Sequence, residues 1–156
     1  AVLAAGGVGS GRQVAAALAL GASGVWMGSY WLTTSEYKLG AAAHGPSSIQ
    51  RALLGASSSD TVRSRIYSGK PARLLKTKWT EAWSKPDAPE PLPMPLQNIL
   101  VSEAHQRMSA ADDPEAVAMP VGQVVGRMNE IRPVAEIMAE LVRGYDEAVE
   151  RLNDAR

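Results

Sequence analysis

The chain has 156 residues, 46% of them hydrophobic and 21% charged, a composition typical of one folded domain and unlike that of disordered chains. Sixteen basic residues balance sixteen acidic ones, so no net field would draw the chain to nucleic acid, and no apolar run approaches the roughly 20 residues that cross a bilayer. The sequence has no cysteine and two histidines, which excludes disulfide bonds and thiolate metal sites, makes a histidine-rich metal site unexpected and fits a cytoplasmic protein.

The first thirty residues predict a parallel βαβ unit. Residues 2–5 are wholly apolar, the pattern of a strand buried on both faces, and a glycine-rich turn follows them directly. Ser10 then offers a helix N-cap, with Gln13 placed to complete a capping box, so a helix is predicted over residues 11–20. Residues 24–28 form the next predicted strand, and two parallel strands need a crossover of this kind.

The middle of the chain predicts shorter elements separated by turns. Pro46 could begin an amphipathic helix with Ile49 and Leu53 on its apolar face. Residues 62–67 are typical of a short strand. Residues 73–83 are interpreted as helical.

A proline-rich stretch divides the chain into two sections. Five prolines fall between residues 85 and 95. Neither a helix nor a central strand can contain them, so this stretch is predicted to be an extended linker. It separates a first section, residues 1–84, from a helical second section, residues 96–156.

The second section ends in the clearest element of the sequence. A long amphipathic helix is predicted to start at Pro133. Its apolar stripe consists of Val134, Ile137, Met138, Leu141, Val142, Tyr145, Val149 and Leu152. Shorter helices are predicted over residues 96–108 and 121–131, with an irregular stretch between them.

Small residues follow both predicted parallel strands, at the end where α/β folds bind ligands. Ala5, Gly6 and Gly7 close the first strand, and Gly28 and Ser29 close the second. Glycines there let a phosphate approach backbone N–H groups with no Cβ in the way, and the helix that follows the first strand adds its positive end. The Rossmann glycine pattern fails on spacing, and the Walker A pattern fails because Gly69 and Lys70 are followed by Pro71 rather than Ser or Thr. A phosphate cradle is therefore predicted, with tight turns that hold no ligand as the alternative.

Several stretches together resemble one known family. The run over residues 4–22, followed by residues 24–29, resembles the nitronate monooxygenases, formerly called 2-nitropropane dioxygenases, and their enoyl-reductase relatives. Residues 60–62 and 68–73 are similar to the family's segment after its last barrel strand. Residues 122–126 resemble its Gly-Gln stretch more loosely.

The resemblance implies a (β/α)8 TIM barrel that carries FMN across the carboxyl ends of its strands. This chain would be the C-terminal portion of that barrel, its last two strands with their helices, followed by a mostly helical C-terminal extension that packs on the barrel. The expected FMN-binding residues are Ala5, Gly6, Gly7, Gly28, Ser29 and Gln123. No metal is expected.

The family's catalytic histidine, on an earlier strand, has no counterpart here. His44 lies past the strand predicted over residues 24–28, which corresponds to the family's last barrel strand, and His105 lies in the tail, so both are interpreted as surface or packing histidines. The catalytic residues are expected upstream, on a partner chain that carries the N-terminal barrel strands. Two strands alone cannot close a barrel and would leave exposed edges. Association with further copies of the same chain is left open.

The leading hypothesis is an FMN-dependent oxidoreductase, with this chain supplying the phosphate-binding end of the flavin site. Its small-molecule substrate would be a nitronate or nitroalkane, or alternatively an enoyl thioester reduced by a flavin-dependent enoyl-CoA-type reductase. A hypothesis from another class is a non-catalytic phosphate-binding subunit. A third is an interaction module built on the terminal helix.

Overall fold

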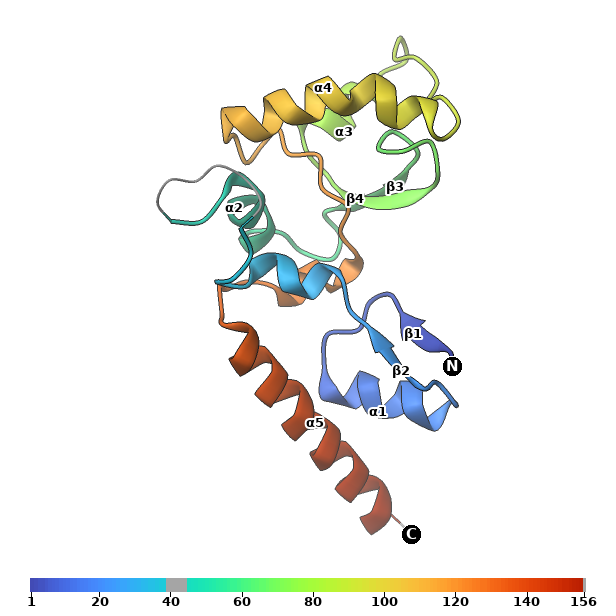
Figure 1. Ribbon diagram of the computed structural model, residues 1–156, viewed down its shortest axis with the longest axis vertical. Helices are drawn as coiled ribbons and strands as arrows, with labels where there is room; N and C mark the ends of the chain where they lie inside the picture. The colour runs from blue at the N-terminus through green and yellow to red at the C-terminus, as the bar shows by residue number, and fades with distance from the viewer. Residues whose placement is uncertain (39–44, 156) are drawn as a thin grey trace.

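The computed structural model of the protein describes residues 1–38 and 45–155. Within them the elements are β1 (Leu3–Ala5), α1 (Gly11–Ala19), β2 (Gly24–Trp26), the 3-10 helix η1 (Ser29–Thr33), α2 (Ser48–Leu54), β3 (Thr61–Ser64), β4 (Ala72–Leu75), α3 (Lys78–Ala82), α4 (Leu96–Ala111), the 3-10 helix η2 (Gln123–Arg127) and α5 (Val134–Asp154). Figure 1 shows β1, α1, β2 and α5 at one end of the molecule and β3, β4, α3 and α4 at the other.

The predicted parallel βαβ unit is confirmed. β1 pairs in parallel with β2, in a register that places Ala5 opposite Trp26. The side chain of Ser10 caps α1 by accepting a hydrogen bond from the N–H of Gln13, as predicted. The α/β class is confirmed with this unit.

The strands of this unit are less buried than their sequence predicts. Val2 is 72% exposed and Trp26 is 66% exposed, although an apolar run is typical of a strand covered on both faces. Within the described residues β1 and β2 form a sheet of two strands, so each strand has one edge without a neighbour. The expectation of burial therefore fails within the described residues, where no further strand pairs with this sheet.

A pair of glycines brings α5 against α1. Gly11, the first residue of α1, is buried, and a Cβ at this position would overlap the backbone of Leu141 and Tyr145. Gly144 lies on the other side of the contact, where a Cβ would be 3.5 Å from the Cα of Gly11. Without side chains at either position the two helix backbones can approach closely. The long terminal helix is thus confirmed, and it packs directly on the βαβ unit (Figure 1).

The predicted helix over residues 73–83 is wrong in its first half. Ala72–Leu75 instead forms the strand β4, which pairs antiparallel with β3 and places Thr61 opposite Leu75. Leu74 and Leu75 point to opposite faces and both are buried, which an exposed helix could not achieve. Strand pairing across the preceding turn overrides the local helical pattern, and the helix α3 starts only at Lys78.

Residues from both sides of the proline-rich stretch share one hydrophobic core. Its members are Tyr30, Ile49, Leu53, Leu75, Val117, Met119, Val121, Val124, Val125, Met128, Ile137 and Leu141. The predicted helix after Pro46 supplies two of them from α2. The division of the chain at residues 85–95 itself stays a prediction.

The proline-rich stretch is held in place at its end. Gln97 is fully buried, and its side-chain oxygen accepts a hydrogen bond from the N–H of Leu92 at 2.9 Å. Its amide nitrogen donates to the carbonyl oxygen of Ile66 at 2.8 Å. One side chain therefore joins this stretch to the turn after β3.

In the described ranges, no helix combines the length and apolar character needed to cross a membrane.

Candidate functional site

The two predicted glycine tips lie side by side. Because Ala5 pairs with Trp26 in a parallel ladder, the residues that follow each strand leave the sheet at the same edge. Gly6 and Gly7 emerge from β1 there, and Gly28 emerges from β2. The register alone thus brings together segments more than twenty residues apart in the sequence.

The tips are open rather than filled by the protein's own side chains. A Cβ built on Gly6, Gly7 or Gly28 would meet no heavy atom within 4 Å, so the space above each backbone is free. Gly6 and Gly7 have φ values of +98° and +70°, a conformation that side-chain-bearing residues rarely adopt. Ala5 is exposed beside them. This arrangement meets the steric requirement of a group that must contact main-chain amides closely.

Gln13 holds the glycine loop in its conformation. Its side-chain oxygen accepts a hydrogen bond from the N–H of Gly9 at 2.8 Å, and its amide nitrogen donates to the carbonyl oxygen of Gly7 at 3.0 Å. The sequence predicted only its capping partnership with Ser10. In a capping box the Gln13 side chain would bond the backbone of Ser10. Here it bonds the backbone of Gly7 and Gly9 instead, and so fixes the glycine loop to the start of α1.

Ser29 connects the second tip to the tail of the chain. Its hydroxyl oxygen accepts a hydrogen bond from the N–H of Gly122 at 3.0 Å, across more than ninety residues of sequence. The hydroxyl proton of Ser29 makes no hydrogen bond within the described residues, so it can be donated to an anion at the tip. Gln123 follows Gly122 directly and is exposed, with its carbonyl oxygen bound by the hydroxyl of Ser58 at 2.7 Å. The structure therefore brings the predicted tail residue to the edge of the predicted cradle.

A small set of core side chains supports the loop from behind. A Cβ at Gly9 would lie within 3.3 Å of the ring of Tyr30 and closer still to the side chain of Val124. Both of these residues are buried in the shared core. The loop therefore rests on the core at Gly9 and is open to solvent at Gly6 and Gly7.

Neither histidine takes part in this site. His44 lies outside the described residues. His105, on α4, stacks on Tyr67 at 4.9 Å between ring centroids and contacts the edge of Trp79 at 5.5 Å. Burial in this aromatic cluster lowers the pKa of His105. In the part of the chain that the structure describes, no grouping of three potential ligand side chains could hold a metal ion.

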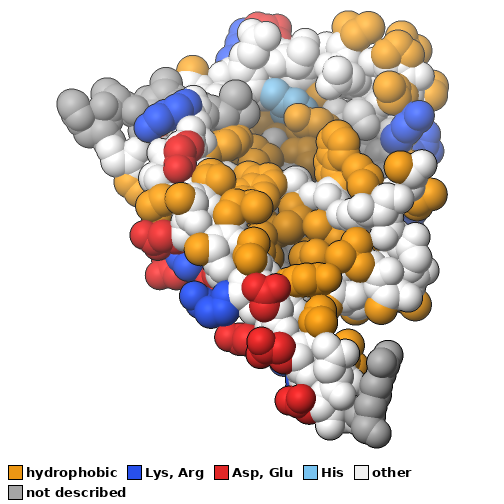
Figure 2. Space-filling view, turned by 60° about the horizontal axis from the view of Figure 1, so that its bottom comes forward, with side chains coloured by type: hydrophobic (Ala, Val, Ile, Leu, Met, Phe, Trp, Pro, Cys, Tyr) orange, Lys and Arg blue, Asp and Glu red, His pale blue; other side chains and the backbone are white. Residues whose placement is uncertain are grey.

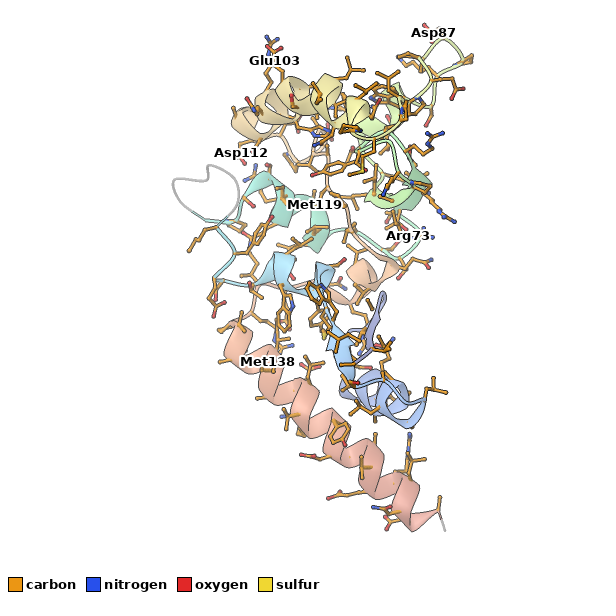
Figure 3. All side chains as sticks on the ribbon, turned by 45° about the vertical axis from the view of Figure 1, so that its right-hand side comes forward. Arg73, Asp87, Glu103, Asp112, Met119 and Met138 are labelled. Atoms are coloured by element: carbon orange, nitrogen blue, oxygen red, sulfur yellow. The ribbon has the colours of Figure 1, made fainter. Side chains whose placement is uncertain are left out.

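An apolar hollow of about 550 Å³ lies between β2, α1 and α5. No pattern in the sequence predicts it. Val14, Trp26, Met138 and Val142 are among the side chains that line it. Met138 is 45% exposed and Val142 is 55% exposed, although both belong to the apolar stripe of α5. Figure 2 shows a broad hydrophobic region open on one face of the molecule, beside a diagonal row of charged side chains, and Figure 3 marks Met138 near the start of α5.

These features define an α/β protein with open glycine tips at the carboxyl ends of two parallel strands. The chain belongs to the nitronate monooxygenase family, whose profile matches residues 1–144. The resemblance identified from the sequence is confirmed by this match.

Individual relatives agree with the family. The chain is 49% identical to a protein of Mycobacterium tuberculosis named as a monooxygenase, over 97% of this chain and 40% of that protein. It is 30% identical to a protein of Staphylococcus aureus named as a nitronate monooxygenase, over 96% of this chain and 40% of that protein. The chain thus spans about 40% of the length of the relatives it matches.

Two solved structures superpose on nearly the whole of this chain. FabK from Thermotoga maritima superposes with a TM-score of 0.74 at 31% identity, covering 99% of this chain and 47% of that one. The nitroalkane oxidase from Streptomyces ansochromogenes superposes with a TM-score of 0.79 at 30% identity, covering 97% of this chain and 41% of that one.

Proposed function

We propose that this chain supplies the phosphate-binding end of an FMN site in an oxidoreductase that oxidises nitronates or nitroalkanes. Family membership supports the activity, and the likeness to a nitroalkane oxidase supports the substrate class. The single observation that carries the site is the open space above Gly6, Gly7 and Gly28 on adjacent parallel strands.

The residues at the tips fit a phosphate group. Backbone N–H groups of Gly7 and Gly28 would donate to phosphate oxygens that no side chain keeps away. Ser29 would add its hydroxyl proton, since its oxygen is already occupied by the N–H of Gly122. Ala5 and Gln123 would border the group on either side. Bound here, FMN would supply the electron transfer, and this chain would hold the phosphate end so that the isoalloxazine ring lies in a defined place.

The apolar hollow supports the view that the chain forms the last two βα units of a larger barrel. Leu3 and Trp26 are exposed on β1 and β2, and Val142 is exposed on α5, so apolar surface borders the open edges of the sheet. Such surface and such edges are covered in a closed barrel. We therefore propose that strands from the N-terminal part of the barrel pair with these edges and fill the hollow, and that those strands bring the catalytic residues.

The cofactor assignment is tested with Gly28→Val. Gly28 has a φ of −106°, which valine adopts without strain, and a Cβ built there meets no heavy atom within 4 Å. The variant should fold normally, but its side chain would occupy the space that a phosphate needs. We expect protein that contains this chain and the rest of the barrel to be yellow, with flavin absorbance at about 450 nm. The Gly28→Val variant should lose the flavin and its colour.

Gly55→Val is the matched control. Gly55 has a φ of −91° and also has open space around it, but it lies at the end of α2 and outside the tips. The control should keep its flavin. Equal flavin retention by Gly28→Val and Gly55→Val would exclude the cradle, and a colourless parent protein that takes up no added FMN would favour a non-catalytic phosphate-binding subunit.

A second candidate reaction is the reduction of an enoyl thioester. The superposition on FabK, together with the family's enoyl-reductase relatives, favours it as the alternative. The two reactions differ in the direction of electron flow at the flavin. Anaerobic addition of a nitronate should bleach the flavin absorbance in the first case, whereas an enoyl thioester should restore the absorbance of a chemically reduced flavin in the second.

A further inference from the structure

A second concave region lies on a different side of the α1–α5 contact. It is a hollow of about 540 Å³ lined by side chains of α1, η2 and α5. Four arginines border it, Arg12, Arg127, Arg143 and Arg151, against two glutamates. We call this region the arginine hollow.

The glutamates are already engaged by other residues. Glu140 accepts a hydrogen bond from Arg132 at 2.6 Å, and Glu147 lies 3.9 Å from Arg143. Among the described residues, Arg12, Arg127 and Arg151 form neither an ion pair nor a side-chain hydrogen bond. The hollow therefore holds three guanidinium groups that form no ion pair with a described carboxylate, and its four arginines outnumber the two glutamates that line it.

The fold, rather than the local sequence, gathers these charges. Arg12 follows Gly11 and Arg143 precedes Gly144, so the close glycine contact between the helices sets both arginines at its rim. Arg127 comes from η2, which is anchored separately in the core. Like charges that line one hollow repel each other, because salt screens charges incompletely within the Debye length, about 8 Å at physiological salt. A bound anion would offset this repulsion.

The arginine hollow is distinct from the flavin cradle. Its lining begins at Ser10 and includes none of the residues of the two glycine tips. Between the two regions along the chain, Gly9 packs against Tyr30 and Val124.

We propose that the arginine hollow binds a multiply charged phosphate anion, with Arg12, Arg127 and Arg151 as donors. A guanidinium group presents several N–H donors in a planar fork that matches phosphate oxygens. Three such groups from three elements can surround a diphosphate, which has more acceptor oxygens than a single carboxylate. The shared chemistry is the diphosphate, whether it is inorganic or part of a nucleotide.

Calorimetric titration with inorganic pyrophosphate tests the proposal, using protein that contains this chain, the rest of its barrel and its flavin. At low ionic strength we expect a dissociation constant of about 1 mM or tighter. Arg12→Gln and Arg151→Gln should each weaken binding about tenfold, the factor that corresponds to one lost charge-assisted hydrogen bond. Arg107→Gln is the matched control, because Arg107 is exposed on α4, pairs with Glu103 and does not line the hollow. This variant should bind pyrophosphate as tightly as the parent protein.

A parallel titration with ADP separates the two sources of the diphosphate. Equal affinities for pyrophosphate and ADP would assign the hollow to the diphosphate alone, and tighter binding of ADP would assign it to a nucleotide. Absence of binding, or equal binding by the parent and the Arg12→Gln/Arg151→Gln double variant, would overturn the proposal. So would loss of pyrophosphate binding in Gly28→Val, which would place the anion in the cradle. Flavin absorbance reports on the cradle separately, because neither arginine variant should change it.

Discussion

Replacing Gly11 by alanine is expected to destabilise the protein, whereas the same change at Gly144 is expected to be neutral or stabilising. A Cβ at Gly11 would overlap backbone atoms of Leu141 and Tyr145, and backbone cannot rotate away as a flexible side chain can. Overpacking of this kind costs roughly 1–3 kcal/mol, of which the helix preference of alanine over glycine recovers at most about 1 kcal/mol.

The partner glycine responds differently because its geometry is different. A Cβ at Gly144 would lie 3.5 Å from the Cα of Gly11, an ordinary van der Waals distance. Only the helix preference then remains, about 0.8–1 kcal/mol in favour of alanine. The helix preference acts on both variants, so their unfolding free energies should differ by the overpacking cost, about 1–3 kcal/mol, with Gly11→Ala the less stable.

Urea denaturation followed by far-ultraviolet circular dichroism measures this difference. With a slope of about 1–3 kcal/mol per molar urea, the midpoints of the two variants should differ by roughly 0.3–3 M. The measurement uses the whole protein that contains this chain. Indistinguishable midpoints for Gly11→Ala and Gly144→Ala would show that the backbones of α1 and α5 are not in close contact.

Two further predictions concern polar groups. Gln97→Ala should destabilise the protein by roughly 2–4 kcal/mol, because it leaves the N–H of Leu92 and the carbonyl of Ile66 without their partner, and a midpoint matching the parent in urea would refute this role. Hydrogen bonds from Arg51 lower the pKa of Asp112 below 3.8, so this carboxylate should stabilise the fold above pH 3.8 and lose that contribution as the pH falls through the lowered value. Asp112→Asn should flatten the acid limb of a plot of melting temperature against pH, and an unchanged limb would contradict the assignment.

Local sequence signals were sufficient where neighbouring residues determine the outcome. The N-cap at Ser10, the helix after Pro46 and the long terminal helix are all set by contacts within one or two helical turns, and all three are confirmed. The helix predicted over residues 73–83 failed for the opposite reason. There the strand β4 is stabilised by pairing with β3, which a local pattern does not contain.

The candidate site divides in the same way. The glycines of the tips were evident from sequence because an open approach to the backbone requires small residues. The clamp of Gln13 on Gly7 and the bond from Gly122 to Ser29 were not, since each depends on the path of the folded chain. The arginine hollow could not be predicted from the sequence either, because its arginines come from three elements that are far apart along the chain.

The sequence by itself determined the parallel βαβ unit, the small residues at its tips and the family to which the chain belongs, because these follow from residue type at close spacing. Only the tertiary structure decided that Ala5 lies opposite Trp26, that Gly11 meets Gly144, and that three of the eight side chains in the apolar stripe of α5 stay exposed. Those outcomes depend on which surfaces meet when distant segments pack, and that choice is made by the whole fold.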